Sequence, residues 1–360
     1  MCEVTEMTFD DLKKLPSCEE EIAAVERPVY IYGMGNGGEK VLGWCAERGI
    51  EVRGVFASDG FVRGQSFCGY EVMSLGQAEE KDGAFTVLLA FGTDLEDVMA
   101  NIDDIEKKHP LFAPDVPVVG EGSFTKAGFL ERLAEAEKVY SLLADEQSRQ
   151  VFLGLTAYKI TGKLSYLREV FTDEQKPSPL LGLGGGEVCV DLGAYNGDTV
   201  LQTAAACGYK KIYALEPEKR NFQKCVRNCA ELDNTEFINA AAWSHDTVLN
   251  FDGGSGRQAK LDGKGRILTA ARSVDSVLNG RECTYIKYDV EGADIPALKG
   301  SAETIRRYRP KLCCALYHRC YDYIDIPLFI EKLQGGYTMY MRQQRYYPAW
   351  ETELLLVYDD

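Results

Sequence analysis

Basic residues are scarce in this sequence of 360 residues. Lysine and arginine together number 40, against 56 aspartate and glutamate residues, which gives a formal net charge of −16. A nucleic-acid backbone would be repelled by this net charge, because phosphates are bound by basic surfaces. We therefore expect no nucleic-acid partner.

Long apolar runs are also missing. No segment approaches the roughly 18 consecutive apolar residues that a membrane-spanning helix needs. The first 20 residues are acidic and polar, and they lack the basic and apolar regions of a secretory signal. These features predict no membrane span and a cytoplasmic location.

Patterns that bind metal are sparse as well. The histidines are His109, His245 and His318, and none of the 12 cysteines forms a CxxC pair. Structural zinc sites draw their ligands from such closely spaced pairs. Cys313 and Cys314 are adjacent in an apolar run, where a disulfide between them would strain the backbone. We expect reduced thiols and no bound metal.

The length, in contrast, is ample for two domains of about 150 residues each. Residues 1–125 begin with an apolar strand at 29–32, a glycine-rich turn and a helical pattern, and further strands are expected at 52–56 and 86–91. Together these predict a small Rossmann-like α/β domain. Residues 126–180 combine helical periodicity on one apolar face with a stretch rich in proline and glycine, so we predict a helical connector. Residues 181–360 alternate strands, one of them expected at 236–242, with helices, one of them expected at 297–308. This alternation predicts a doubly wound, mostly parallel sheet closed by an antiparallel strand pair.

A first glycine motif lies near the start of the chain. Gly33, Gly35 and Gly38 satisfy the GxGxxG spacing of dinucleotide-binding turns, with Asp59 roughly twenty residues later. Asp59 lies past the second predicted strand, however, and residues 1–125 are short for a complete dinucleotide fold. We favour an accessory role for this domain, in dimer contacts or acceptor selection. NAD binding, by an NAD-dependent sugar-nucleotide oxidoreductase, is the alternative.

A second glycine turn opens residues 181–360. A strand ends near Asp191 and Gly193, and Gly197 precedes a helix. Glycine lets the backbone approach a ligand closely, and a helix amino terminus favours an anionic group. The next strand ends at Glu216 and Pro217, where a carboxylate can accept hydrogen bonds from both hydroxyls of a ribose. The spacing predicts a site for a ligand that contains ribose.

Two carboxylates end a later strand. Asp289 and Glu291 alternate with Val290, so they share one face at the carboxyl end of the strand over residues 284–290. Such carboxylates can orient a substrate hydroxyl, accept its proton or hold a divalent ion.

Four segments in this order resemble the FkbM family of S-adenosylmethionine-dependent methyltransferases: VDLGAYNGDT, YALEPEKRNFQKCVRN, IKYDVEGADIPALKG and RYRPKL. The resemblance implies a class I methyltransferase domain with a mostly parallel seven-stranded sheet. It also implies O-methylation of saccharides or natural products. By matching position, the residues that would contact S-adenosylmethionine are Asp191, Gly193, Ala194, Asn196, Gly197, Glu216, Pro217, Ala242 and Trp243. Glu216 would bind the ribose, and residues 241–243 would lie near the adenine.

The chain departs from the family after Arg309 and Pro310. Many members place an acid and a histidine at the end of the next strand, whereas this sequence keeps only His318, followed by Asp322. We predict that a neutral His318 accepts the proton of the acceptor hydroxyl, because an imidazole with a pKa near 6.5 is mostly neutral above pH 7. Asp289 and Glu291 would orient that hydroxyl.

Other readings of these residues stay open. His318 could be an exposed histidine or one at the edge of the core, without a role at the acceptor. Alternatively, Asp289 and Glu291 could hold a divalent metal that lowers the pKa of the hydroxyl. The chain could also be a scaffold that binds S-adenosylmethionine or a nucleotide without catalysis. We favour an enzyme that acts on a small-molecule or glycan acceptor and that forms a homodimer.

Overall fold

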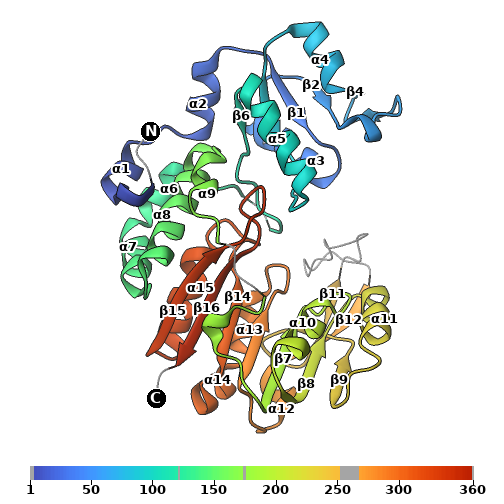
Figure 1. The fold of residues 1–360 in the computed structure, drawn as a ribbon, viewed down its shortest axis with the longest axis vertical. Coiled ribbons are helices and arrows are strands. Elements are labelled where there is room, and N and C mark those ends of the chain that lie inside the picture. Colours follow the sequence, from blue (N-terminus) through green and yellow to red (C-terminus); the bar gives the residue numbers. More distant parts are fainter. Residues whose placement is uncertain (1–3, 121, 173–175, 252–266, 359–360) are drawn as a thin grey trace.

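The structure is a computed structural model that describes residues 4–120, 122–172, 176–251 and 267–358. Figure 1 shows an amino-terminal lobe at the top, a group of helices below it, and a carboxy-terminal sheet with its helices at the bottom. Among the described residues, no helix is both long and apolar enough to cross a membrane.

A six-stranded sheet forms the amino-terminal lobe, in the order β3-β4-β2-β1-β5-β6. Its strands are β1 (Val29–Tyr32), β2 (Val52–Phe56), β3 (Ser66–Phe67), β4 (Tyr70–Met73), β5 (Thr86–Leu89) and β6 (Leu111–Phe112). The helices of this part are η1 (Val4–Glu6), α1 (Phe9–Lys14), α2 (Cys18–Val25), α3 (Asn36–Glu47), η2 (Asp59–Phe61), α4 (Leu75–Asp82) and α5 (Glu96–Lys108). The central strand β1 is buried along its whole length, as expected for a parallel strand covered on both faces.

Three strands of this lobe follow the sequence-based prediction, and three were not predicted. The expected strands correspond to β1, β2 and β5. The additional strands β3, β4 and β6 have two to four residues each, which is too short for a recognisable alternation of apolar and polar residues.

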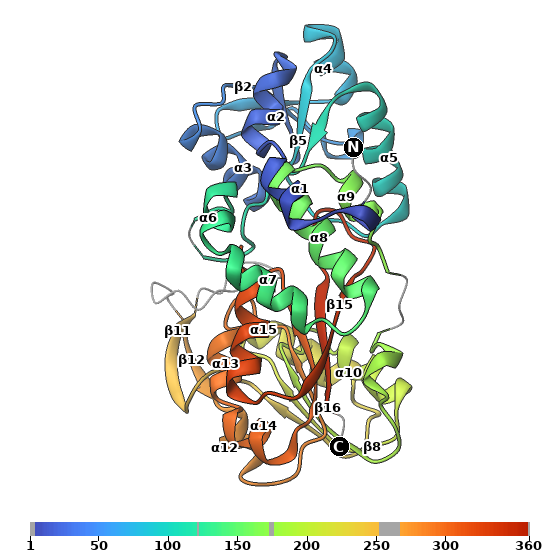
Figure 2. The ribbon, with the colours of Figure 1, turned by 90° about the vertical axis from the view of Figure 1, so that its left-hand side faces the viewer.

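The helices after this lobe are α6 (Lys126–Glu131), α7 (Leu133–Leu142), α8 (Glu146–Thr161), α9 (Ser165–Arg168) and the short η3 (Pro179–Leu181). We predicted helices with one apolar face, but residues 151–161 of α8 are all buried. This helix packs against α1, α2 and β15, and Figure 2 shows it between the amino-terminal lobe and the carboxy-terminal sheet. A helix enclosed by neighbours on all sides needs no polar face, which explains the difference.

The carboxy-terminal sheet has the strand order β15-β16-β14-β13-β7-β8-β9. Its strands are β7 (Glu187–Leu192), β8 (Tyr209–Leu215), β9 (Thr235–Ile238), β13 (Tyr285–Tyr288), β14 (Lys311–Ala315), β15 (Tyr337–Gln343) and β16 (Thr352–Tyr358). Strand β16 is antiparallel to β14 and β15, and the other neighbours are parallel. The predicted seven-stranded Rossmann-like sheet is therefore confirmed. Its order reverses between β7 and β13, the position at which such sheets bind ligands.

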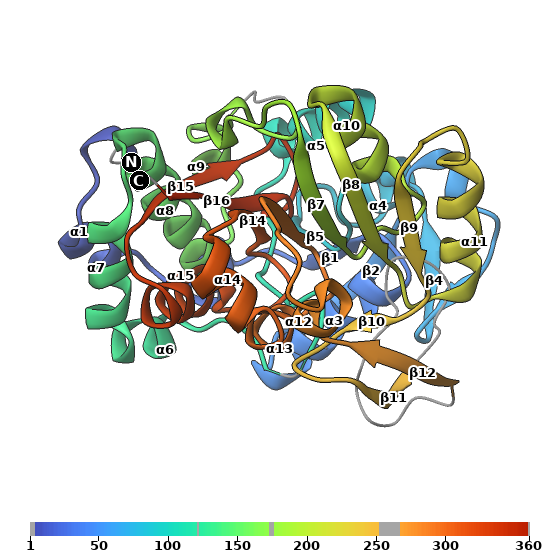
Figure 3. The ribbon, with the colours of Figure 1, turned by 90° about the horizontal axis from the view of Figure 1, so that it is seen from below.

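The remaining elements surround this sheet. They are α10 (Asp198–Ala206), α11 (Lys219–Asn228), α12 (Val274–Leu278), α13 (Asp294–Lys299), α14 (Ala302–Tyr308), α15 (Asp322–Leu333) and a small sheet of β10 (Ala241–Ala242), β11 (Thr247–Phe251) and β12 (Ile267–Arg272). Figure 3 shows α10 on one side of the large sheet and α12, α13 and α14 on the other. Helices on both faces leave the carboxyl ends of the strands as the accessible edge.

Two predicted elements of this region are divided in the structure. The strand expected at 236–242 splits into β9 and β10, because the chain turns after Ile238 and the Asn239 side chain donates hydrogen bonds to the carbonyls of Glu216 and Pro217. The helix expected at 297–308 breaks at Gly300, where a Cβ atom would lie 2.0 Å from the carbonyl oxygen of Trp243.

Candidate functional site

A cavity of about 810 Å³ lies at the carboxyl ends of the central strands of the carboxy-terminal sheet. Its walls come from three parts of the chain. The loop after β5 contributes Asp94, the segment before η3 contributes Lys176, and the sheet with its loops contributes most of the rest. The lobes are joined beside it by two backbone hydrogen bonds between Thr93 and Tyr347.

The predicted site residues divide into those that line this cavity and those that do not. The lining residues are Gly193, Glu216, Pro217, Ala242, Asp289 and Glu291. Those that do not line it are Asp191, Ala194, Asn196, Gly197, Trp243 and His318. Trp243 lines a neighbouring cavity of about 160 Å³ instead.

The glycines of the turn after β7 serve packing. Gly193 has φ = +86°, and a Cβ atom there would lie 1.9 Å from the carbonyl oxygen of Asp289. A Cβ atom on Gly197 would lie 2.5 Å from the Sγ atom of Cys229. Only glycine therefore allows β7 and β13 to approach so closely at their carboxyl ends, and helix α11 to pack on the start of α10.

Glu216 is fixed in place by the backbone. Its carboxylate is buried at the end of β8, where it accepts hydrogen bonds from the backbone N–H groups of Tyr195 at 2.9 Å and Glu218 at 2.7 Å. Burial raises the pKa of Glu216 to about 7, although these two donors act in the opposite direction. Each oxygen accepts one of these bonds, and a carboxylate oxygen can accept a second. Glu216 is thus equipped to bind two hydroxyl groups of a ligand.

Lys287 is a buried cation between two carboxylates of the site. Its Nζ atom lies 3.7 Å from Oδ1 of Asp191 and 3.2 Å from Oδ2 of Asp289. Burial alone would lower the pKa of Lys287, but Asp289 and Asp191 raise it well above its usual value. Sequence reasoning missed this residue. The sequence feature that could have identified Lys287 is its position two residues before Asp289, because side chains two residues apart in a strand point to the same face.

Asp289 is held by several donors and still reaches the cavity. The Tyr317 hydroxyl donates a hydrogen bond to its Oδ1 atom at 3.2 Å, and the Nε2 atom of His318 lies 3.2 Å from the same oxygen. Burial raises the pKa of Asp289, but Lys287 and His318 outweigh this effect and hold it well below its usual range. Asp289 is therefore an ionised, oriented hydrogen-bond acceptor and a weak base.

His318 lies beneath the cavity and is fully buried. Its Nδ1 atom is 3.1 Å from Asp294, and its Nε2 atom is 3.9 Å from Glu291 in addition to its contact with Asp289. Burial would lower the pKa of His318, but these three carboxylates raise it well above 6.5. An imidazole that is protonated and buried has no free lone pair for a substrate. This geometry does not suit the expected role of His318 as a neutral proton acceptor.

Two residues of the site have an unusual backbone. Tyr195 has φ = +45° and Glu291 has φ = +50°, a conformation that is costly for residues with a side chain, and both line the cavity. Strained residues persist where the surrounding structure holds them, and they cluster at active sites. Their position here supports a functional role for the turns after β7 and β13.

Comparisons with known proteins agree with this architecture. Residues 191–345 match the family described as the methyltransferase FkbM domain. The crystal structure of methyltransferase FkbM from Methylobacillus flagellatus KT has 20% sequence identity and a TM-score of 0.72, and the match covers 99% of this chain and 97% of that chain. An rRNA methylase from Streptococcus thermophilus has 14% identity and a TM-score of 0.37, and the match covers 52% of this chain and 99% of that chain. No curated protein matches the sequence. Residues 191–345 are therefore similar in sequence to the methyltransferase FkbM domain, and the chain shares the fold of the M. flagellatus protein.

Proposed function

We propose that this protein transfers the methyl group of S-adenosylmethionine to a hydroxyl oxygen of a small-molecule or glycan acceptor. The observation that carries the proposal is Glu216, a buried carboxylate that lines a cavity of about 810 Å³ and can accept two further hydrogen bonds. Paired hydroxyls of a ribose match this acceptor pattern. When bound, S-adenosylmethionine supplies a methyl group made electrophilic by its sulfonium.

The chain's residues fit the parts of this cofactor. Glu216 would accept the ribose hydroxyls, and Ala242 would line the adenine end. Gly193 and Thr199 line the same cavity, and Thr199 lies in the first turn of α10, where an anionic carboxylate of the cofactor would be favoured. Asp191 acts from below the cavity, because it accepts a hydrogen bond from the Thr199 hydroxyl at 2.6 Å and so orients that side chain.

On the acceptor side, the chain supplies orientation and a proton acceptor. Asp289 would accept a hydrogen bond from the acceptor hydroxyl, since Lys287 and Tyr317 keep its carboxylate ionised and fixed. We assign proton removal to Glu291, which lines the cavity and lies 3.9 Å from the Nε2 atom of His318. His318 then acts as a positioning residue that holds both carboxylates through its Nε2 atom.

The amino-terminal lobe would take part in acceptor selection. Asp94 lines the same cavity as Arg345, Tyr346 and Glu351, which lie in the loop between β15 and β16. The hydrogen bonds between Thr93 and Tyr347 connect the two loops directly. An acceptor that enters between the lobes would meet charged groups from both.

A screen of hydroxylated sugars, glycolipid precursors and polyketides for transfer of a labelled methyl group tests the proposed methyl transfer.

The Glu216→Ala variant is expected to bind S-adenosylhomocysteine more weakly by about 1–3 kcal/mol, because the buried ribose hydroxyls would lose their partner. Isothermal titration calorimetry measures this difference. Glu231→Gln, at an exposed position after α11, is the matched control and is expected to bind as the wild type does. Equal affinity of wild type and Glu216→Ala would contradict the ribose assignment.

Cofactor affinity is expected to depend on pH through Glu216. The ionised carboxylate is the better acceptor, and its pKa is raised to about 7. Affinity for S-adenosylhomocysteine should therefore fall as the pH drops below about 7, with a limiting slope of about tenfold per pH unit, and should level off above it. In Glu216→Gln this dependence should disappear. A dependence that survives in Glu216→Gln would have to come from another group.

The amino-terminal lobe is expected to bind no dinucleotide. Asp59, the acidic residue required for the ribose, lies in η2 beyond the end of β2. A Cβ atom on Gly38, the last glycine of the motif, would lie 2.9 Å from the Phe67 ring, so this glycine serves packing. In parallel thermal melts, S-adenosylhomocysteine should raise the unfolding midpoint, whereas NAD and NADP should not. A shift with NAD that vanishes in Gly35→Val would show that this lobe does bind a dinucleotide.

A further inference from the structure

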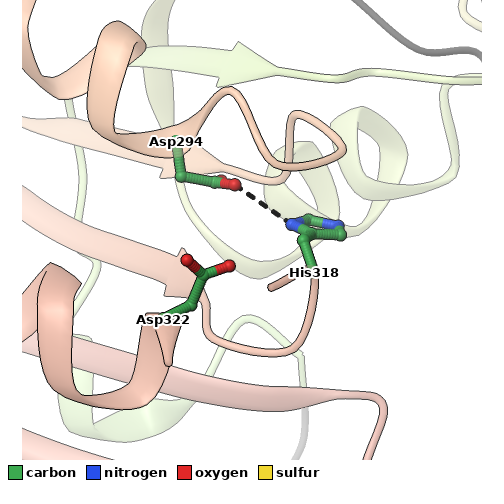
Figure 4. Close-up of side chains that lie close together, drawn as sticks. All are labelled: Asp294, His318 and Asp322. Atoms are coloured by element: carbon green, nitrogen blue, oxygen red, sulfur yellow. Dashed lines mark hydrogen bonds and ion pairs between the residues drawn. The ribbon is translucent and has the colours of Figure 1, made fainter. Parts of the chain in front are cut away.

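We propose that Asp294, His318 and Asp322 bind one divalent transition-metal ion beneath the acceptor side of the cavity. Asp294 begins α13, Asp322 begins α15, and His318 lies in the loop after β14. Figure 4 shows the three side chains converging. This site goes beyond the proposed methyl transfer and replaces our expectation of a chain without metal.

The spacing of the donor atoms suits one ion. The Nδ1 atom of His318 lies 3.1 Å from Oδ2 of Asp294, and one donor atom from each of the three residues lies within 4.8 Å of the others. Ligand atoms bound at about 2.0–2.2 Å to one ion are separated by roughly 3–4.4 Å. Small movements of the Asp322 side chain would therefore complete the set.

The carboxylates are already oriented by the backbone. The N–H group of Arg319 donates to Oδ2 of Asp322 at 2.8 Å, and the N–H group of Val290 lies 3.5 Å from Oδ1 of Asp294. All three donor side chains are almost completely buried, with exposed fractions of 0–3%. Ligand carboxylates of metal sites are held in the same way by outer hydrogen bonds.

Cations are fewer than carboxylates in this region. Among the described residues, the carboxylates of Asp191, Asp289, Asp294 and Asp322 have three neighbouring cations, which are Lys287, His318 and Arg319. Lys287 contacts Asp191 and Asp289, so the shortage of positive charge lies beside Asp294 and Asp322. A divalent ion that displaces the Nδ1 proton of His318 adds one net positive charge there. Buried carboxylates need such compensation.

The second nitrogen of His318 supports the same assignment. Its Nε2 atom is buried, has no hydrogen bond of good geometry, and faces Asp289 at 3.2 Å. A histidine that binds metal through one nitrogen usually donates the N–H group of the other to a carboxylate. A metal at Nδ1 would fix this tautomer and direct the Nε2–H group toward Asp289 and Glu291. The ion would then position the acceptor side of the site through His318.

The donor set indicates the class of metal. One imidazole nitrogen with two carboxylates suits first-row transition ions better than Mg²⁺ or Ca²⁺, which prefer oxygen donors alone. Asp322 also lines the neighbouring cavity of about 160 Å³, together with Glu291 and Arg319. Mn²⁺ is the probe of choice because its binding can be followed by electron paramagnetic resonance.

The experiment titrates the full-length protein, after treatment with a chelator, with Mn²⁺ in the absence of S-adenosylmethionine and acceptor. We expect one bound ion per chain and a spin-echo modulation from one imidazole nitrogen. Asp294→Asn and Asp322→Asn should each raise the dissociation constant at least about tenfold. Asp325→Asn, an exposed aspartate in the same helix as Asp322, and His245→Gln, an exposed histidine, should bind as the wild type does.

Several outcomes would overturn the proposal. They are no binding of Mn²⁺ or Zn²⁺ by the wild type at millimolar concentration, binding without imidazole modulation, and unchanged affinity in both asparagine variants. The first two are measured on the wild type, so they decide the question even if a variant fails to fold. Because neither cofactor nor acceptor is present, this result is independent of whether the proposed methyl transfer is correct.

Discussion

Replacing Lys287 by methionine is expected to destabilise the fold by about 3–5 kcal/mol, the cost of removing one partner from a buried ion pair. The ammonium group of Lys287 lies between Asp191 and Asp289, and its side chain is only 11% exposed. Methionine keeps much of the apolar stem but leaves two carboxylates without their cation. Urea unfolding at neutral pH, followed by circular dichroism, measures the decrease in the free energy of unfolding.

The control for this prediction is Lys211→Met in the neighbouring strand β8. Lys211 pairs with Glu236 at 3.3 Å on a more exposed part of the sheet, so its loss should cost less than about 1 kcal/mol. Combining Lys287→Met with Asp191→Asn should restore part of the stability, because the uncompensated buried charge is then smaller. If Lys287→Met were as stable as Lys211→Met, the prediction that Lys287 stabilises the fold by pairing with Asp191 and Asp289 would be contradicted.

The sequence was most informative where topology alone decides position. Glu216 and Asp289 each end a parallel strand, and the carboxyl ends of such strands meet at one edge of the sheet. Their location at a common cavity could therefore be predicted without any side-chain detail. The mostly parallel sheet closed by an antiparallel strand pair was also predicted, from the alternation of strands and helices together with the resemblance to the FkbM family.

The environment of each side chain could not be predicted in this way. His318 was predicted to be a neutral proton acceptor, yet helices α13 and α15 bring Asp294 and Asp322 against it. These contacts join residues from three separate elements, and no local pattern encodes them. The same holds for α8, whose complete burial depends on neighbours from both lobes.

Glycine motifs were ambiguous for a related reason. Gly193 and Gly197 were predicted to give a ligand access to the backbone, and the structure shows that both also permit close packing of neighbouring elements. Either use requires a residue without a Cβ atom. The sequence cannot separate the two uses, because it shows only that the side chain is missing and not which atoms approach.

The Asp289→Asn variant is expected to lower kcat by about 10²-fold or more while leaving the affinity for S-adenosylhomocysteine near that of the wild type. Asparagine has nearly the same shape, so the loss reports on charge and not on packing. The amide keeps one acceptor oxygen, which cannot serve Lys287, Tyr317 and an acceptor hydroxyl together. We expect kcat and cofactor affinity to respond differently because Asp289 would contact the acceptor, whereas Glu216 would contact the cofactor.

Three further variants assign the roles within this group. Glu291→Gln should also lose about 10²-fold in kcat if Glu291 accepts the proton, whereas Tyr317→Phe, which removes one donor to Asp289, should lose less. Asp233→Asn, at an exposed turn before β9, should match the wild type. Turnover is measured with whichever acceptor the labelled-methyl screen identifies. Near-normal kcat in Asp289→Asn, with intact folding, would remove Asp289 from the acceptor site and leave Glu291 as the carboxylate that contacts the hydroxyl.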